Sequence, residues 1–172
     1  ADTLNYLQQI SSQLSLQVAA PQECLHYVGL IVHNVNNTGS SPSWLIKLLE
    51  RSGIRSISPV VDITNYVMLQ LGQPMHAFDF AAVKVGIHVR MASQAEQLKL
   101  LDGKTANLAE NTLVICDAKN NPLALAGVMG GMDSGVQSET CSLILESAFF
   151  APDMIQGQAK RYGVSSDSAF RF

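Results

Sequence analysis

The sequence predicts an α+β fold, with a strand-rich core and helices gathered in the first half and at the end. Three observations predict it. A run rich in β-branched and aromatic residues spans 25–35. Two stretches with helical spacing and glycine stops follow before residue 73. After Gly86 the chain becomes short strand-like runs separated by turn residues.

The chain begins with a segment of different character. Residues 1–22 mix Leu and Ile with many Gln and Ser and end near Pro21. We expect a connecting segment there, with at most one short helix, and a folded domain over 23–172. Within 25–35, apolar residues occur on both faces of the expected strand, which is typical of a strand with both faces partly buried.

The first predicted helix starts near Pro42, with Ser41 or Ser43 as its cap. Gly53 stands where a C-terminal glycine is expected. The apolar stripe of this helix consists of Leu45, Leu48 and Leu49.

The second predicted helix covers 63–71, with Asp62 as its cap and Gly72 as its stop. Gln73 and Pro74 then force an extended turn that leads to His76. The expected apolar stripe consists of Ile63, Tyr66, Val67 and Leu71.

Short strands are expected next, with Asp102-Gly103 as a hairpin signal. The near-continuous apolar runs 123–128 and 143–149 are typical of strands buried on both faces. A last helix is expected over 152–162, ended by Gly163. The other strand candidates are 87–91, 97–101, 104–108 and 112–117.

Composition narrows the function. The 172 residues are 47% hydrophobic and 15% charged, which describes a globular domain with a large core. No apolar run reaches membrane-spanning length and no signal peptide is recognisable, so we expect no membrane partner. The net charge of −3 means that a nucleic-acid partner would need cations from elsewhere for most of its affinity.

The three cysteines, Cys24, Cys116 and Cys141, include no CxxC pair. We expect reduced thiols in a cytoplasmic protein and no metal site.

The most informative stretch, 59–80, reads PVVDITNYVMLQLGQPMHAFDF. It places Asp62, Thr64, Asn65 and His76 in a segment otherwise apolar enough for a core. A buried polar group without a partner costs about 1–3 kcal/mol. The group therefore indicates either a dense hydrogen-bond network or the wall of a site. A core histidine is the alternative for His76, while His26, His33 and His88 are expected to be ordinary strand residues.

Two further features attract attention. Gly127, Gly130 and Gly131 follow a buried strand, which indicates close backbone approach or, alternatively, a tight bend in a sheet. The phosphate-loop pattern is absent. Glu146 lies in an apolar strand on the face of Ile144 and Ala148. If buried it needs donors, and a ligand hydroxyl is one; the alternative is an exposed glutamate on an edge strand.

Four motifs in order resemble the B3/B4 domain of the bacterial phenylalanyl-tRNA synthetase β subunit. They are PSWL…SGIRSI, VVDITNYVM…GQPMHAFD, LALAGVMGG and LESAFF, and the resemblance covers about 25–172. The tail from Arg161 is similar to the family's RxGLRTDASxRF, with Ser166 in place of threonine and Ser168 in place of alanine. The family continues beyond this point, so the chain is expected to be a fragment of a longer polypeptide.

The resemblance implies a β-sandwich-like core and an editing site that hydrolyses tyrosine wrongly attached to phenylalanine tRNA. It implies that His76, Thr64 and Asn65 surround the ester and position water. Glu146 would accept the tyrosine hydroxyl. The remaining pocket residues would be Gly127, Gly130, Ser166 and Ser168.

The implied parent enzyme is a ligase that uses ATP and magnesium, with no cofactor in this domain. Its implied partners are the tRNA 3′ end and the synthetase α subunit in an α2β2 assembly. Two other functions remain open: a non-catalytic module that contacts tRNA or the α subunit, and a free-standing deacylase of the same fold.

Overall fold

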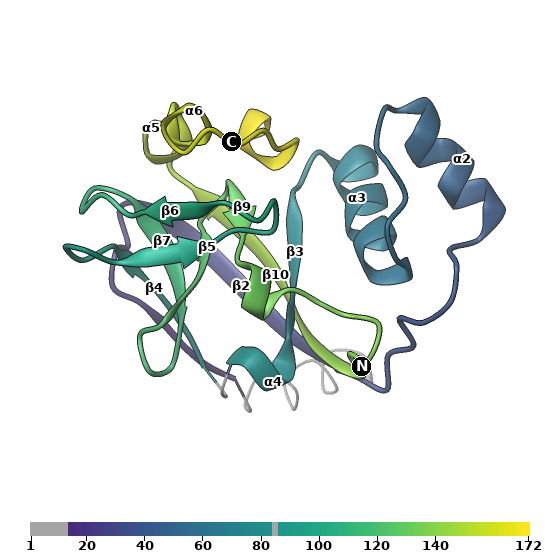
Figure 1. Ribbon diagram of the computed structural model, residues 1–172, viewed down its shortest axis with the longest axis horizontal. Coiled ribbons are helices and arrows are strands. Elements are labelled where there is room, and N and C mark those ends of the chain that lie inside the picture. Colours follow the sequence, from purple (N-terminus) through teal and green to yellow (C-terminus); the bar gives the residue numbers. More distant parts are fainter. Residues whose placement is uncertain (1–13, 84–85) are drawn as a thin grey trace.

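The computed structural model describes residues 14–83 and 86–172, and Figure 1 shows a body of strands with α2 and α3 to one side. The expected α+β class is confirmed. The expectation for residues 1–13 lies outside the described part of the chain.

The largest sheet has five strands in the order β1-β4-β7-β8-β9. β1 runs parallel to β4, and the other neighbours are antiparallel. The end of the expected connecting segment therefore belongs to the sheet, and residues 14–22 contain a strand and no helix. The strands are β1 (Ser15–Val18), β4 (Gly86–Met91), β7 (Leu113–Asp117), β8 (Pro122–Leu125) and β9 (Met129–Gly130).

A second sheet has three strands in the order β2-β10-β3. They are β2 (Cys24–His33), β10 (Ser142–Phe150) and β3 (Met75–Asp79), with β10 in the centre. The predicted hairpin at Gly103 joins β5 (Gln97–Lys99) to β6 (Thr105–Asn107), and Gly103 has a φ of 85° that favours glycine.

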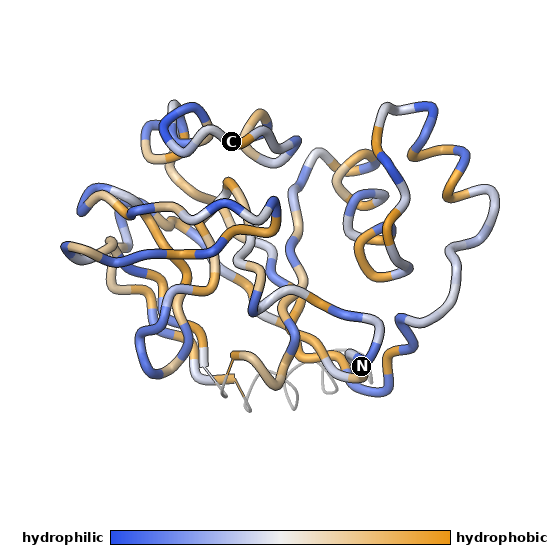
Figure 2. The backbone as a smooth tube through the Cα atoms, in the orientation of Figure 1, coloured by the Kyte–Doolittle hydropathy of each residue, from blue (hydrophilic) through white to orange (hydrophobic). Residues whose placement is uncertain are grey.

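One apolar core is shared by the two larger sheets. Ile31, Phe78 and Ile144 of the three-stranded sheet lie in the same cluster as Val89 and Ile115 of the five-stranded sheet. The hydropathy colouring of Figure 2 shows orange along these strands and blue at many of the outer turns. The arrangement explains why the runs 113–117 and 143–150 are almost uninterrupted in apolar residues.

Helix α2 (Ser43–Arg51) buries Leu45 and Leu49, as its stripe predicts. The predicted serine cap is wrong. Pro42 occupies the N-cap position without a side-chain hydrogen bond, and the Ser41 hydroxyl instead donates to Asp62. Gly53 follows the helix with a φ of 79°.

Helix α3 (Pro59–Leu71) begins four residues earlier than predicted. Pro59 is its first residue, so Asp62 lies inside the first turn and is not the cap. Asp62 is fully buried and accepts hydrogen bonds from Ser41 Oγ, Ser56 Oγ and Ile57 N at 2.5, 2.6 and 2.9 Å. Asp62 thus belongs to a satisfied network that joins α3 to the segments before it.

The predicted apolar stripe of α3 is not its buried face, and Tyr66 and Val67 of the stripe are only half-buried. Ile63 is 54% exposed and Leu71 is 75% exposed, whereas Val60, Thr64 and Met68 are buried. Val60 packs with Ala77 of β3 and Leu143 of β10. Because Ala77 alternates with His76, this contact places α3 over the face of the three-stranded sheet that is opposite His76.

The predicted helix over 152–162 is interrupted. It forms two short helices, α5 (Pro152–Ile155) and α6 (Gln158–Arg161), because Gln156 is extended and Gly157 has a φ of 79°. Gly163 ends the second with a φ of 63°. The remaining short helices are α4 (Phe80–Val83), η1 (Met132–Ser134) and η2 (Ser168–Phe170). Within 14–83 and 86–172, no helix is long and apolar enough to cross a membrane.

Candidate functional site

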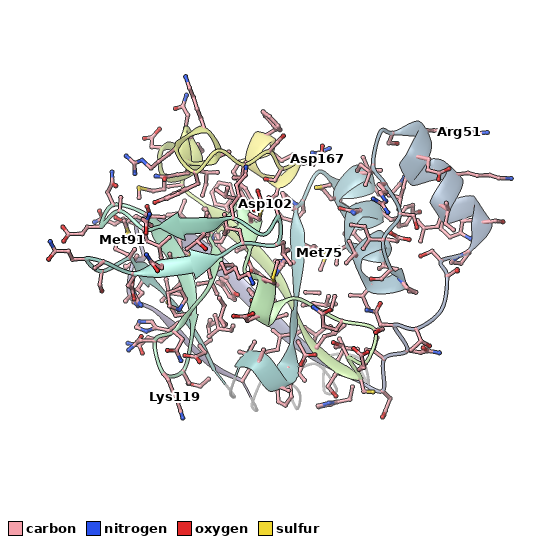
Figure 3. The ribbon with its side chains drawn as sticks, viewed as in Figure 1. Arg51, Met75, Met91, Asp102, Lys119 and Asp167 are labelled. Atoms are coloured by element: carbon pink, nitrogen blue, oxygen red, sulfur yellow. The ribbon has the colours of Figure 1, made fainter. Side chains whose placement is uncertain are left out.

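A cavity of about 80 Å³ lies between the two larger sheets. His76 and Glu146 line it from the three-stranded sheet, and Leu125 and Gly130 line it from the other. Ser168 and Phe172 of the C-terminal segment complete the wall. In Figure 3, Met75 marks the start of β3 near the middle of the molecule, and Asp167 marks the C-terminal segment above it.

Glu146 is held at the centre of its sheet. It is 6% exposed, and its cross-strand partners are Gly29 on β2 and His76 on β3. Directly opposite residues in antiparallel strands project to the same face, so Glu146 and His76 are neighbours. The edge-strand alternative for Glu146 is therefore wrong.

The turn that delivers His76 is fixed by a side chain. The Gln73 amide donates to the carbonyls of Pro74 at 3.1 Å and Ala148 at 2.9 Å, which ties the start of β3 to β10. The His76 ring packs edge-on against Phe78 with ring centroids 4.5 Å apart. Its Nε2 atom is buried and has no hydrogen-bond partner among the described residues.

Gly130 is glycine because the His76 ring occupies the adjacent space. A Cβ atom on Gly130 would lie 2.5 Å from His76 Cε1 and 2.8 Å from Nε2. The close approach predicted for this glycine cluster is thus present, and the sheet-bend alternative does not account for Gly130.

Replacing Gly130 by alanine is expected to lower the free energy of unfolding by about 1–3 kcal/mol, because the buried His76 ring must move. Urea unfolding measures the change, and the NMR signals of the His76 ring should shift as well. Gly39→Ala is the matched control, because a Cβ there meets no atom within 4 Å. Equal stability of the two variants would contradict the packing argument.

Burial alters the protonation of both groups. It lowers the pKa of His76 to about 4, so the imidazole is neutral at neutral pH. It raises the pKa of Glu146 to about 8. Glu146 Oε2, like His76 Nε2, lacks a partner among the described residues. Two residues that line one cavity therefore each have a buried polar atom that needs a hydrogen bond.

Gly127 and the C-terminal segment hold each other in place. Gly127 has a φ of 67°, and a Cβ there would lie 2.8 Å from Ile155 and 3.1 Å from both Phe150 and Phe172. The Ser168 hydroxyl donates to the Gly127 carbonyl at 3.1 Å. Ser168 thus lines the cavity with its hydroxyl already bonded.

Three predicted site residues lie outside the lining of the cavity. The Thr64 hydroxyl is used within α3, where it donates to the Val61 carbonyl at 2.8 Å. Asn65 also lies on α3, which covers the opposite face of the three-stranded sheet. Ser166 Oγ accepts a hydrogen bond from Ala169 N at 3.2 Å, inside the segment that contributes Ser168.

One polar group near the site was missed from the sequence. The Tyr27 hydroxyl is buried and has no hydrogen-bond partner within 14–83 and 86–172. Burial, followed by the charge of Glu146, raises the pKa of Tyr27 well above its ordinary value. Strand alternation could have found it, because Tyr27 and Gly29 lie on the face of β2 that continues the Glu146 face of β10.

Other chemistries find little support in the part of the chain that the structure describes. No group of three or more His, Cys, Asp or Glu side chains is arranged to hold a metal ion there. All three cysteines are free. Burial raises the pKa of Cys24 to about 11 and that of Cys116 to about 12, so neither is an activated nucleophile.

Comparison with known proteins identifies the family. Residues 23–172 match the family model described as the B3/4 domain. The chain belongs to the B3/4 domain family. This B3/4 domain is 54% identical over 163 residues to the phenylalanine–tRNA ligase β subunit of Aliivibrio fischeri and 52% identical to that of Haemophilus influenzae. Each match covers 95% of the chain and 20% of the relative, so the chain spans about a fifth of these β subunits.

A solved structure has a related fold. An N-terminal fragment of the phenylalanyl-tRNA synthetase β subunit from Pyrococcus horikoshii matches with a TM-score of 0.58 and 13% identity. The match covers 83% of this B3/4 domain and 45% of that chain. At this identity the comparison supports the fold alone.

Proposed function

We propose that this B3/4 domain is the editing domain of a phenylalanine–tRNA ligase, which hydrolyses tyrosine wrongly attached to phenylalanine tRNA. The observation that carries the proposal is that Glu146 and His76 line one cavity and that each has a buried atom, Oε2 or Nε2, with no hydrogen-bond partner among the described residues. Each such atom costs about 1–3 kcal/mol unless a ligand supplies its partner.

An editing site answers a physical problem of selection. An apolar pocket rejects an analogue that merely adds a hydroxyl by only about a hundredfold. A second pocket that binds the hydroxyl supplies the missing discrimination. In this domain the tyrosine hydroxyl would donate to Glu146, and a phenylalanine side chain would leave this buried polar group without a partner.

The hydrolytic step needs water beside the ester. Water would add to the carbonyl carbon, and the bond to the ribose oxygen would break, with a proton passing to that oxygen. Neutral His76 has an imidazole nitrogen that can accept a hydrogen bond from this water. The roles of Thr64 and Asn65 at the ester remain part of the proposal and would require the ester to reach α3.

The cavity must enlarge before a tyrosine side chain can enter. Its volume of about 80 Å³ is smaller than the ~150 Å³ of a cavity that binds benzene. The wall formed by Ser168 and Phe172 rests on one hydroxyl bond and an aromatic contact between Phe150 and Phe172, with centroids 5.3 Å apart.

Deacylation of mischarged tRNA tests the proposed function. Tyr-tRNA and Phe-tRNA would each be incubated with this chain and, separately, with the complete ligase. Faster release of tyrosine than of phenylalanine supports editing, and activity of the chain alone identifies a free-standing deacylase. Loss of neither amino acid in either experiment would leave the non-catalytic module as the function.

RNA contacts in this domain would have to come from a small number of cations. Trp44, Lys47 and Arg51 are exposed and spaced three and four residues apart, so they share one face of α2. Trp44 is 56% exposed and meets Tyr66 edge-on with centroids 5.5 Å apart. Figure 3 shows Arg51 projecting away from the molecule. An exposed aromatic ring beside cations suits stacking and phosphate contacts.

The isolated chain is expected to bind tRNA weakly, because its net charge is −3. A dissociation constant no tighter than about 1 μM at physiological salt is expected, with affinity falling steeply as salt rises. Replacing both Lys47 and Arg51 by alanine should reduce the salt slope by about 0.7–0.9 per lost phosphate contact. Lys119 and Lys160, on other elements, provide the matched double-alanine control. Submicromolar binding by the chain alone would contradict this expectation.

A further inference from the structure

Tyr27 lies behind Glu146, outside the cavity lining, and it is placed there by the pairing of β2 with β10. Tyr27 is opposite Ala148, and Gly29 is opposite Glu146, so Tyr27 is the diagonal neighbour of Glu146 on the same face. Diagonal positions lie within reach of aromatic and long side chains.

Gly29 lies between Tyr27 and Glu146 on this face and adds no side chain of its own between them. A Cβ on Gly29 would lie 3.9 Å from Tyr27 Cε1, which shows that the ring leans along the strand toward the position of Glu146. The same Cβ would lie 2.6 Å from Leu14 Cδ2, so a larger residue does not fit.

Neither polar group has a hydrogen-bond partner among the residues that the structure describes. The Tyr27 hydroxyl and Glu146 Oε2 are both buried. Yet each changes the protonation of the other: the Glu146 charge raises the pKa of Tyr27, and after burial the Tyr27 hydroxyl is the second influence on Glu146, lowering its pKa.

We propose that Tyr27 is a positioning residue for Glu146: its hydroxyl donates to the carboxylate and favours the ionised form, which accepts a ligand hydroxyl. This inference rests on the proposed editing function, because it concerns how the same carboxylate selects its ligand. A neutral carboxylic acid can donate as well as accept, and it discriminates a phenol less strictly than an acceptor-only carboxylate does.

Few other groups can stabilise the Glu146 charge. Cys24 from β2 and His76 from β3 are its other ionisable neighbours, and neither is a cation at neutral pH. The cavity lining contains no ionisable side chain apart from His76 and Glu146. The Tyr27 hydroxyl is therefore the donor that the fold itself provides.

The test measures the ionisation of Glu146 directly, by carbon-13 NMR of the chain with labelled glutamate side chains. Glu146→Gln identifies the signal. Tyr27→Phe is expected to raise the midpoint of Glu146 ionisation by about one to two pH units, since a hydrogen bond to a charged group is lost. Tyr66→Phe, which removes a hydroxyl from α3, is the control and should leave the midpoint unchanged.

Activity gives a second reading with the complete ligase. In Tyr27→Phe the preference for Tyr-tRNA over Phe-tRNA should decline at neutral pH and recover at higher pH, with the same shift as the NMR midpoint. An unchanged midpoint in Tyr27→Phe, or an equal change in Tyr66→Phe, would overturn the role of Tyr27. A shifted midpoint with no deacylation in any protein would instead overturn the editing function and leave the Tyr27–Glu146 pair intact.

A substitution that keeps the hydroxyl guards against misfolding of Tyr27→Phe. Fluorotyrosine at position 27 has a more acidic hydroxyl, so it should lower the Glu146 midpoint, opposite to phenylalanine. A midpoint that does not move with fluorotyrosine would also overturn the proposal.

Discussion

Glu146→Ala in the complete ligase is expected to slow the hydrolysis of Tyr-tRNA by about 10- to 150-fold. The estimate follows from one hydrogen bond to a charged acceptor, worth roughly 1.5–3 kcal/mol, at about 1.4 kcal/mol for each factor of ten. Phenylalanine activation should change far less, because its site is expected on the other subunit. Deacylation of Tyr-tRNA and Phe-tRNA, measured beside phenylalanine activation, gives all three quantities.

The same variant should also narrow the discrimination between the two amino acids. Without the Glu146 side chain, neither tyrosine nor phenylalanine meets an unpaired polar group in the cavity. Leu145→Ala is a suitable control, because Leu145 is the neighbour of Glu146 on the opposite face of β10 and packs in the cluster under α3. If Glu146→Ala edits Tyr-tRNA at the wild-type rate, Glu146 has a structural role, and Ser168 becomes the next candidate for reading the hydroxyl.

The stability of the isolated chain is expected to fall by about 2 kcal/mol between pH 6.5 and pH 8, at about 1.4 kcal/mol per pH unit. Burial raises the pKa of Glu146 from 4.5 to about 8, so above pH 4.5 the unfolded chain has released a proton that the folded chain keeps. This contribution is therefore complete below pH 4.5 and is lost as the pH rises to 8.

His76 acts in the opposite direction. Its pKa is lowered from 6.5 to about 4, so its contribution is complete above pH 6.5 and is lost as the pH falls to 4. Between pH 4.5 and 6.5 the effects of Glu146 and His76 on the free energy of unfolding cancel. The decline in stability above pH 6.5 is therefore due to Glu146 alone. Urea unfolding at a series of pH values measures it, and Glu146→Gln should abolish the decline. A wild-type profile that is flat from pH 6.5 to 8 would show that Glu146 ionises normally.

Local signals in the sequence were sufficient for the elements with simple alternation or a clear stop. β2, the hairpin at Gly103 and the C-terminal end of α2 follow from alternation and glycine alone. The start of α3 was also available, since proline after serine is a common helix beginning. The prediction of one continuous helix over 152–162 is wrong because Gly157 adopts a left-handed conformation that interrupts the helix.

The orientation of α3 could not be obtained from its own sequence. Ile63 and Leu71 are more apolar than Thr64, yet Thr64 is the buried residue. Two tertiary contacts decide how α3 is rotated about its axis. Asp62 accepts hydrogen bonds from Ser41 and Ser56, and Val60 packs against the three-stranded sheet. Thr64 tolerates burial because its hydroxyl is bonded within the helix. These tertiary contacts also give the polar residues of 59–80 different roles. Asp62 belongs to a hydrogen-bond network, and His76 lines the cavity.

The alternation of side chains along β10 also fixes how β10 pairs with β2 and β3 during folding. Leu143 and Leu145 face the cluster under α3, and Ile144, Glu146 and Ala148 face the shared core and the cavity. A slip of β10 by one residue would exchange these faces and press Glu146 into an apolar layer that has no cavity and no tyrosine beside it. Such a misaligned sheet would contain an uncompensated carboxylate. Glu146 thus destabilises the misaligned sheet more than it destabilises the native sheet. The group that is proposed to select the substrate therefore also favours a single alignment of the strands.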